Sequence, residues 1–128
     1  MKKKTLIFVA IISAISGLLT LVSGEIKPEA QDQILRHVVL LDLNEKATGA
    51  VVREMKNELQ GLKENIPQIR ELEFGTNIQN GTDYSHCMLL TFDDVESLKE
   101  YENHPMHLEF ASRYGKYVEK KTEVDYWR

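Results

Sequence analysis

The sequence predicts one α+β domain with the element order β-α-β-β-α-β, preceded by a short leader. Four short segments are rich in apolar, β-branched or aromatic residues, as in strands. Between them lie longer segments with apolar residues at helical spacing, and glycine, proline or asparagine marks most of the boundaries. The chain has 128 residues, which suits one domain plus a leader.

The first 24 residues are typical of a signal peptide. A basic start is followed by an uncharged apolar run over residues 6–22, and small residues precede the expected cleavage after Gly24. The alternative is an uncleaved N-terminal anchor, because the apolar run approaches the length that spans a bilayer. We therefore expect an exported protein, periplasmic or extracellular in a bacterium, with membrane contact only if the leader is uncleaved. Residues 25–34 are predicted to be a polar linker, and residues 35–128 the domain.

The charge balance excludes some classes of function. Three of the 16 basic residues lie in the leader, so the remainder carries 13 basic against 20 acidic residues, a net charge of −7. Such an acidic surface argues against nucleic acid as a partner, because phosphates need basic residues. Cys87 is the single cysteine, which excludes an internal disulfide and a zinc site built on several thiolates.

The first half of the domain contains a strand, a helix and a second strand. Residues 36–43 form a nearly continuous apolar run, typical of a strand buried on both faces. Residues 48–65 carry Val51, Met55, Leu59 and Leu62 at helical spacing, and Pro67 ends the predicted helix. Residues 71–78 alternate as a half-buried strand does, and Asn80-Gly81 predicts a hairpin turn.

The second half repeats the strand-helix-strand order. Residues 84–92 are a third strand, again apolar on both faces. Residues 95–102 start a second helix, which His104-Pro105 restarts. Residues 122–127 form the last strand. The order is the ferredoxin-like pattern, an antiparallel sheet with two helices on one face. Right-handed crossovers place the first and third strands side by side at its centre.

One face of the predicted sheet lacks a covering layer. The helices cover one side only, yet Val38 and Leu40 oppose Val39 and Leu41 on the first strand. A second copy of the sheet is the simplest cover, so we expect a homodimer through this face, a dimeric α+β barrel. A lipid, or another exported protein bound through the same face, is the alternative.

The order and spacing of several short motifs carry a family resemblance. These motifs are Arg36-His37-Val38-Val39, Asn65-Ile66-Pro67, Glu73-Phe74-Gly75, Tyr84-Ser85-His86, Thr91-Phe92, Tyr101, His104-Pro105-Met106-His107 and Val124-Asp125-Tyr126-Trp127. Across residues 35–128 the sequence resembles the stress-responsive dimeric α/β-barrel (Dabb) family. The resemblance implies the βαββαβ fold and a homodimer.

The resemblance also implies a pocket. A plant polyketide cyclase of this family uses one histidine on the third strand and another opening the last helix, which His86 and His107 match. Tyr101 matches a tyrosine of the same pocket, and Leu59 stands where the cyclase has a further pocket tyrosine.

The alternation of side chains along the strands predicts a pocket in the same region, independently of the family resemblance. His86 shares a face with Met88, and His37 shares a face with Val39, so the two imidazoles can meet in one layer. We expect His86 to abstract a proton beside a carbonyl while His107 or Tyr101 hydrogen-bonds the developing oxyanion. The remaining predicted ligand-binding residues are His37, Leu59, Met88, Phe110 and Tyr114.

This hypothesis describes a small-molecule-binding homodimer that acts on an apolar carbonyl compound, with cyclase- or lyase-like acid–base activity. It needs no cofactor, and the sequence has no glycine-rich phosphate loop. The alternative is a non-catalytic stress-response or assembly protein whose histidines are structural, since buried histidines often only bind main-chain oxygens. A metal site is not expected, because no acidic ligand accompanies His104 and His107.

Overall fold

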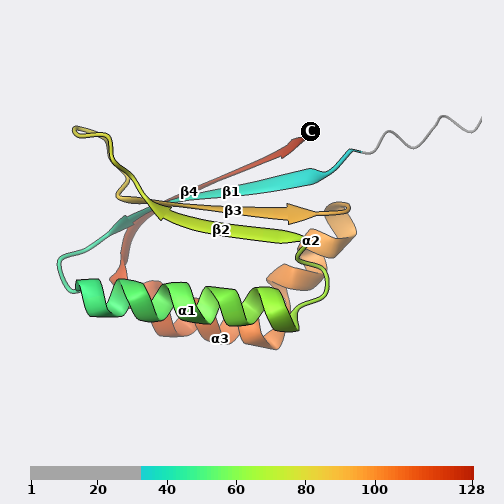
Figure 1. Cartoon of the computed structure of the whole chain (residues 1–128), viewed down its shortest axis with the longest axis horizontal. Helices are drawn as coiled ribbons and strands as arrows, with labels where there is room; N and C mark the ends of the chain where they lie inside the picture. The colour runs from blue at the N-terminus through green and yellow to red at the C-terminus, as the bar shows by residue number, and fades with distance from the viewer. Residues whose placement is uncertain (1–32) are drawn as a thin grey trace, which may run out of the picture.

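Four antiparallel strands and three helices make up the domain in the computed structural model, which describes residues 33–128 (Figure 1). The elements are β1 (Leu35–Leu43), α1 (Gly49–Asn65), β2 (Glu71–Thr76), β3 (His86–Phe92), α2 (Val95–Glu102), α3 (Pro105–Tyr114), the 3-10 turn η1 (Gly115–Tyr117) and β4 (Val118–Trp127). The predicted leader and nearly all of the predicted linker lie outside the described residues.

The sheet order is β2-β3-β1-β4, which confirms that the first and third strands are central neighbours. The register pairs His37 of β1 with Leu90 of β3 on one side and with Asp125 of β4 on the other. Directly paired residues point to the same face of an antiparallel sheet. His37 and Asp125 therefore share the face that the helices cover.

The helices begin and end where capping chemistry allows. The Thr48 hydroxyl accepts a hydrogen bond from the Val51 amide at the start of α1, and the Asp94 carboxylate does the same for Ser97 in α2. The second predicted helical segment, which the sequence restarts at His104-Pro105, consists of two separate helices, α2 and α3. The chain is extended at His104, and Pro105 cannot donate a main-chain hydrogen bond, so α3 starts afresh.

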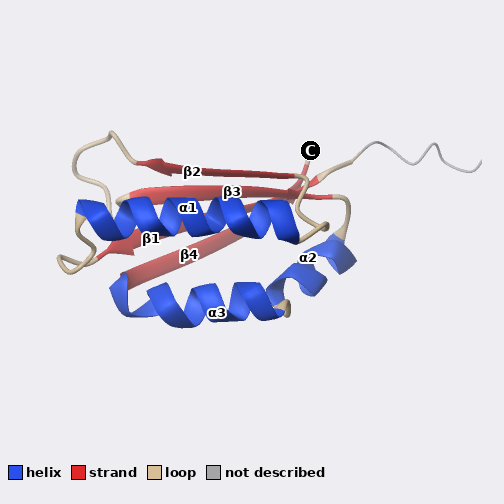
Figure 2. Ribbon diagram, turned by 60° about the horizontal axis from the view of Figure 1, so that its bottom comes forward, coloured by secondary structure: helices blue, strands red, loops and turns tan. Residues whose placement is uncertain are grey.

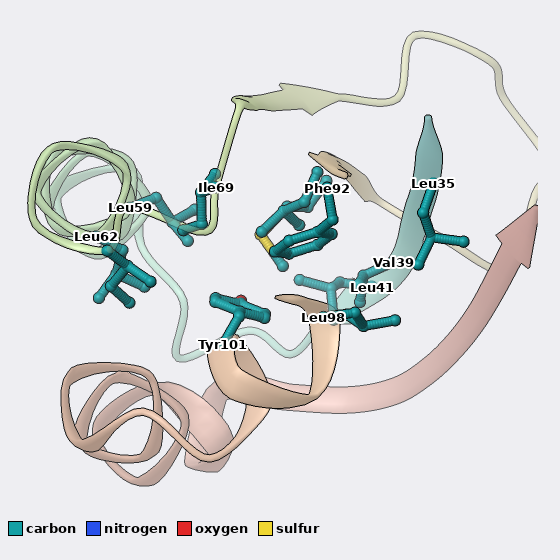
Figure 3. Close-up of a cluster of buried hydrophobic side chains, with 12 residues drawn as sticks. Leu35, Val39, Leu41, Leu59, Leu62, Ile69, Phe92, Leu98 and Tyr101 are labelled. Atoms are coloured by element: carbon teal, nitrogen blue, oxygen red, sulfur yellow. The ribbon is translucent and has the colours of Figure 1, made fainter. Parts of the chain in front are cut away.

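All three helices lie on one side of the sheet, with α1 and α3 side by side (Figure 2). Figure 3 shows the core between this layer and β1 and β3, where Leu59 and Leu62 of α1, Phe92 of β3 and Tyr101 of α2 belong to one buried cluster. Among the helices of residues 33–128, none combines the length and the apolar character that a membrane span requires.

Strand bounds differ from the prediction at four ends, of which the start of β1 differs by one residue. β2 stops at Thr76 and β3 starts at His86, because the Asn77 side chain binds the Thr82 hydroxyl and the Tyr84 carbonyl within the intervening loop. Gly81 in this loop has φ of 76°, which glycine adopts without strain. β4 is longer than predicted, because Lys120 and Lys121 of its charged start pair with β1, with a register shift beside Asp42 and Leu43, and an edge strand tolerates such charges.

The opposite face of the sheet carries apolar side chains without a covering layer in residues 33–128 (Figure 1). Val38, Leu40 and Leu89 are half-buried there, and Val124 and Tyr126 of β4 are 49% and 46% exposed. Exposed apolar patches are typical of surfaces that contact another protein, a membrane or a ligand.

Candidate functional site

A cavity of about 420 Å³ lies between α3 and the part of the sheet formed by β1 and β4. The strands supply an apolar floor, and the helices supply aromatic rings. Six of the residues predicted from the sequence line it: His37, Met88, Tyr101, His107, Phe110 and Tyr114. Its volume suits a small organic ligand.

His37 is held by a carboxylate from the neighbouring strand. Its Nδ1 lies 2.6 Å from Oδ1 of Asp125, because the β1–β4 register sets these two residues opposite each other. The imidazole is buried, whereas the Asp125 side chain is 48% exposed. A carboxylate only accepts hydrogen bonds, so Nδ1 of His37 carries a proton, and Nε2 is the nitrogen that is able to act as a base when the ring is neutral.

His107 is oriented by the break between α2 and α3. The last carbonyl groups of a helix lack partners within that helix, and the Glu102 carbonyl at the end of α2 accepts a hydrogen bond from Nδ1 of His107 at 3.0 Å. Since a carbonyl cannot donate, Nδ1 again carries the proton. Within residues 33–128 neither His37 nor His107 makes a second ring hydrogen bond, so both Nε2 atoms are free.

Tyr101 lies between His107 and the core residue Phe92. Its ring centroid is 4.3 Å from that of His107 and 5.3 Å from that of Phe92. Burial raises the pKa of the Tyr101 hydroxyl, and the carboxylates of Glu102 and Glu123 act in the same direction. The hydroxyl therefore stays protonated at neutral pH and is able to donate a hydrogen bond.

Tyr114 closes the cavity at the end of α3. Its ring lies 4.8 Å from that of Phe110, centroid to centroid. Burial raises the pKa of Tyr114 to about 12, and the nearby Glu58 carboxylate contributes in the same direction. The hydroxyl is buried and has no hydrogen-bond partner among the residues that the structure describes.

The structure does not bring His86 or Leu59 into this cavity. His86 lies at the start of β3 and stacks on Phe74 at 5.4 Å, with Nδ1 3.0 Å from the Ser85 hydroxyl. It lines a second hollow, of about 460 Å³, beside β2. The expected meeting of His86 with His107 is therefore corrected: β3 separates β1 from β2, and the His86 ring packs toward β2. Leu59 is fully buried in the core.

Burial lowers the pKa of His86, with the Asp42 carboxylate acting in the opposite direction. His104 also has a structural role, since its Nδ1 accepts a hydrogen bond from the Met106 amide at the start of α3. These two histidines therefore fit the interpretation of structural imidazoles.

Sequence reasoning missed Asp125 as a partner of His37, and it missed the charged wall that Glu119, Lys121 and Glu123 of β4 add to the cavity. One signal was available. Residues 121, 123 and 125 alternate along the last strand, which predicts that their side chains share a face. The sequence did not show which residues of the neighbouring strand these side chains contact, because that depends on the register between β1 and β4.

Comparison with known proteins identifies the family. The family model described as "Stress responsive A/B Barrel Domain" (Dabb) matches residues 35–128. The chain belongs to the Dabb family. This confirms the resemblance carried by the motifs between residues 36 and 127.

Two plant Dabb relatives are similar in sequence. Olivetolic acid cyclase of Cannabis sativa is 26% identical over 95 residues, a match that covers 72% of this chain and 94% of the cyclase. The stress-response A/B barrel domain-containing protein HS1 of Arabidopsis thaliana is 26% identical over 97 residues, covering 72% of this chain and 87% of that protein.

Solved Dabb-like structures share the fold. A dimeric ferredoxin-like protein of unknown function from Bacteroides fragilis has a TM-score of 0.65 and 26% identity, covering 73% of this chain and 94% of its own. Hydroxynitrile lyase from Passiflora edulis has a TM-score of 0.69 and 20% identity, covering 76% and 94%. These likenesses confirm the ferredoxin-like α+β fold.

Proposed function

We propose that the cavity beneath α3 binds a small carbonyl compound and transfers protons on it without a cofactor. One observation carries this proposal: two imidazoles line the same cavity, and each has its Nδ1 bound to an oxygen acceptor, so that each Nε2 is free to act as a base. A neutral imidazole exchanges protons readily near pH 7.

The groups around the cavity suit distinct roles. Nε2 of His37 takes a proton from the carbon beside the carbonyl, and Asp125 stabilises the imidazolium that forms. The Tyr101 hydroxyl, which stays protonated, donates a hydrogen bond to the oxyanion that develops on the carbonyl. Nε2 of His107, once it has taken a proton from solvent, gives that proton to the carbon of the product, and His37 releases to solvent the proton that it took. This assignment replaces the predicted base His86 by His37.

One of the two sequence relatives is named a cyclase, which supports a catalytic role for the cavity. In this chain Leu59, at the position that the resemblance gives to a pocket tyrosine of the cyclase, lies in the core and not in the cavity. We therefore propose the reaction class, proton transfer beside a carbonyl, for this chain. We do not propose that it acts on the cyclase's substrate.

Hydrogen–deuterium exchange tests the chemistry without a known substrate. Acetophenone in D₂O exchanges its methyl protons through enolisation, and proton NMR follows the loss of signal. We expect the purified protein to accelerate this exchange. General acid–base groups contribute about 10²–10⁴-fold, so His37→Ala and His107→Ala should each lose about 10²-fold, and Tyr101→Phe should also slow the exchange.

His86→Ala is the matched control, because this imidazole lies in the other hollow. It should leave the exchange rate unchanged. An equal loss in His86→Ala and His37→Ala would contradict the assignment. No acceleration by the wild-type protein would favour the alternative, a non-catalytic protein in which the histidines only stabilise the fold.

We also propose that the protein is exported and works as a homodimer through the open sheet face. The leader-like residues 1–24 support export. The half-buried Val38, Leu40 and Leu89 support the dimer, and so do related structures from Bacteroides fragilis and Thermobifida fusca that are described as dimeric.

A further inference from the structure

The wall that β4 contributes to the cavity is charged. Glu119, Lys121 and Glu123 line it, and Asp125 lies beyond them on the same strand, against His37. The rest of the lining differs sharply from this wall. Val39, Leu41, Met55 and Met88 offer only carbon and sulfur atoms. A ligand that fills this space therefore meets an apolar surface on one side and ionised groups on the other.

The charges on this wall do not balance. Two carboxylates, those of Glu119 and Glu123, line the cavity with one ammonium, that of Lys121, and a third carboxylate, that of Asp125, lies behind the His37 ring. Lys121 is already engaged, since its Nζ lies 2.7 Å from Oε1 of Glu123. No other lysine or arginine of residues 33–128 lines the cavity. The wall is therefore negative overall, and it attracts cations more than anions.

Two further features favour a cation. The cavity presents the rings of Tyr101, Phe110 and Tyr114, and the faces of aromatic rings attract positive charge. The ring of Tyr114 lines this space, while its buried hydroxyl lies near the Glu58 carboxylate and makes no hydrogen bond among the described residues. Glu102 and Glu123 add to the field that disfavours negative charge at Tyr101.

We propose that the ligand of this cavity carries a protonated amine together with its carbonyl group, and that this amine lies against Glu119 and Glu123 while the apolar body rests on Met55 and Met88. This inference rests on the proposed function and specifies its substrate class, an amino-carbonyl compound. The ammonium group also offsets the negative field that otherwise opposes an oxyanion at Tyr101.

Three probes with the same phenyl body separate charge from apolar contact: 2-phenylethylamine, 2-phenylethanol and phenylacetate. Their affinities for the full-length protein are measured by ligand-observed NMR at 20 mM and 500 mM salt. We expect the amine to bind about tenfold more tightly than the alcohol at low salt, equivalent to about 1.4 kcal/mol, and phenylacetate to bind most weakly. High salt should reduce the preference for the amine.

The double variant Glu119→Gln/Glu123→Gln should lose the preference for the amine and bind 2-phenylethanol as the wild type does. Glu64→Gln, on the exposed surface of α1 and away from the cavity lining, is the control for a general change in charge. Circular dichroism verifies that each variant is folded.

The outcomes separate the two proposals. Equal affinity for the amine and the alcohol, or a preference for the amine that survives in the double variant, would overturn the inference and leave the proton-transfer function standing. Failure of all three probes to bind would overturn the inference and count against the proposed function as well. Acceleration of acetophenone exchange without preference for the amine would overturn the inference alone.

Discussion

The hydrogen bond between His37 and Asp125 is the contact on which the site depends most, and Asp125→Ala tests it. A buried hydrogen bond to a charged group contributes about 1.5–3 kcal/mol. The Nδ1–Oδ1 distance is short, 2.6 Å, but the Asp125 side chain is 48% exposed. Solvent screening reduces the contribution to about 1 kcal/mol.

Two measurements follow the loss of this contact. Urea unfolding should show a decrease of about 1 kcal/mol in the free energy of unfolding, and thermal unfolding a decrease of about 4–8 °C in Tm. Long-range proton–nitrogen NMR should show the proton of neutral His37 on Nδ1 in the wild type and distributed over both ring nitrogens in Asp125→Ala. The tautomer of His107 should not change, because Glu102 still holds it.

Glu123→Ala is the matched control. Glu123 lies two residues away on the same face of β4 and, within residues 33–128, forms its one ion pair with the half-exposed Lys121, so its removal should cost less than about 0.5 kcal/mol. If Asp125→Ala is no more destabilising than Glu123→Ala, and if the His37 tautomer is the same in both, then Asp125 does not orient His37 and the assignment of His37 as the base fails.

Three other predictions concern the fold and its assembly. Leu59→Ala should reduce the free energy of unfolding by about 2–5 kcal/mol in urea titrations, because this side chain is 1% exposed in the core; a loss below 1 kcal/mol would contradict that packing. Burial lowers the pKa of His86 in the folded state, so the unfolded state binds more protons near pH 6. The contribution of His86 to the free energy of unfolding is therefore complete above the unfolded pKa of about 6.5 and is lost as the pH falls below it. His86→Phe should accordingly lose less stability than the wild type between pH 7.5 and 5.5, and parallel pH profiles would refute this. Leu40→Glu should convert a dimer to a monomer in sedimentation experiments, since Leu40 lies on the open sheet face; an unchanged dimer mass would place the interface elsewhere.

The fold was predictable because its signals are local. The apolar runs of β1 and β3, the helical spacing of Met55, Leu59 and Leu62, and the break at Pro105 each depend on a few neighbouring residues. The central position of β1 and β3 followed from the handedness of crossovers, and the sheet order confirms it. The charged start of β4 escaped prediction because an edge strand tolerates exposed charges on its main-chain ladder.

The site was predictable only in part. Helical spacing and strand alternation placed His37, His107 and Tyr114 in the layer between sheet and helices, the family resemblance placed Tyr101 there, and all four line the cavity. Alternation also gave His86 the same face, but it says nothing about the direction in which a ring leans along that face. Packing on Phe74 takes the His86 ring toward β2, away from the other imidazoles.

The sequence by itself determined which segments are strands and helices, which side of each is apolar, and that His37 would be buried, because hydrophobic periodicity is a property of short stretches of chain. The tertiary structure alone decided that Asp125 binds His37, that Glu102 holds His107, and that β4 lines the cavity with charge. These contacts join residues that are 88 and 5 positions apart in the chain. They depend on strand register and on the angle between α2 and α3, which are set when the layers pack.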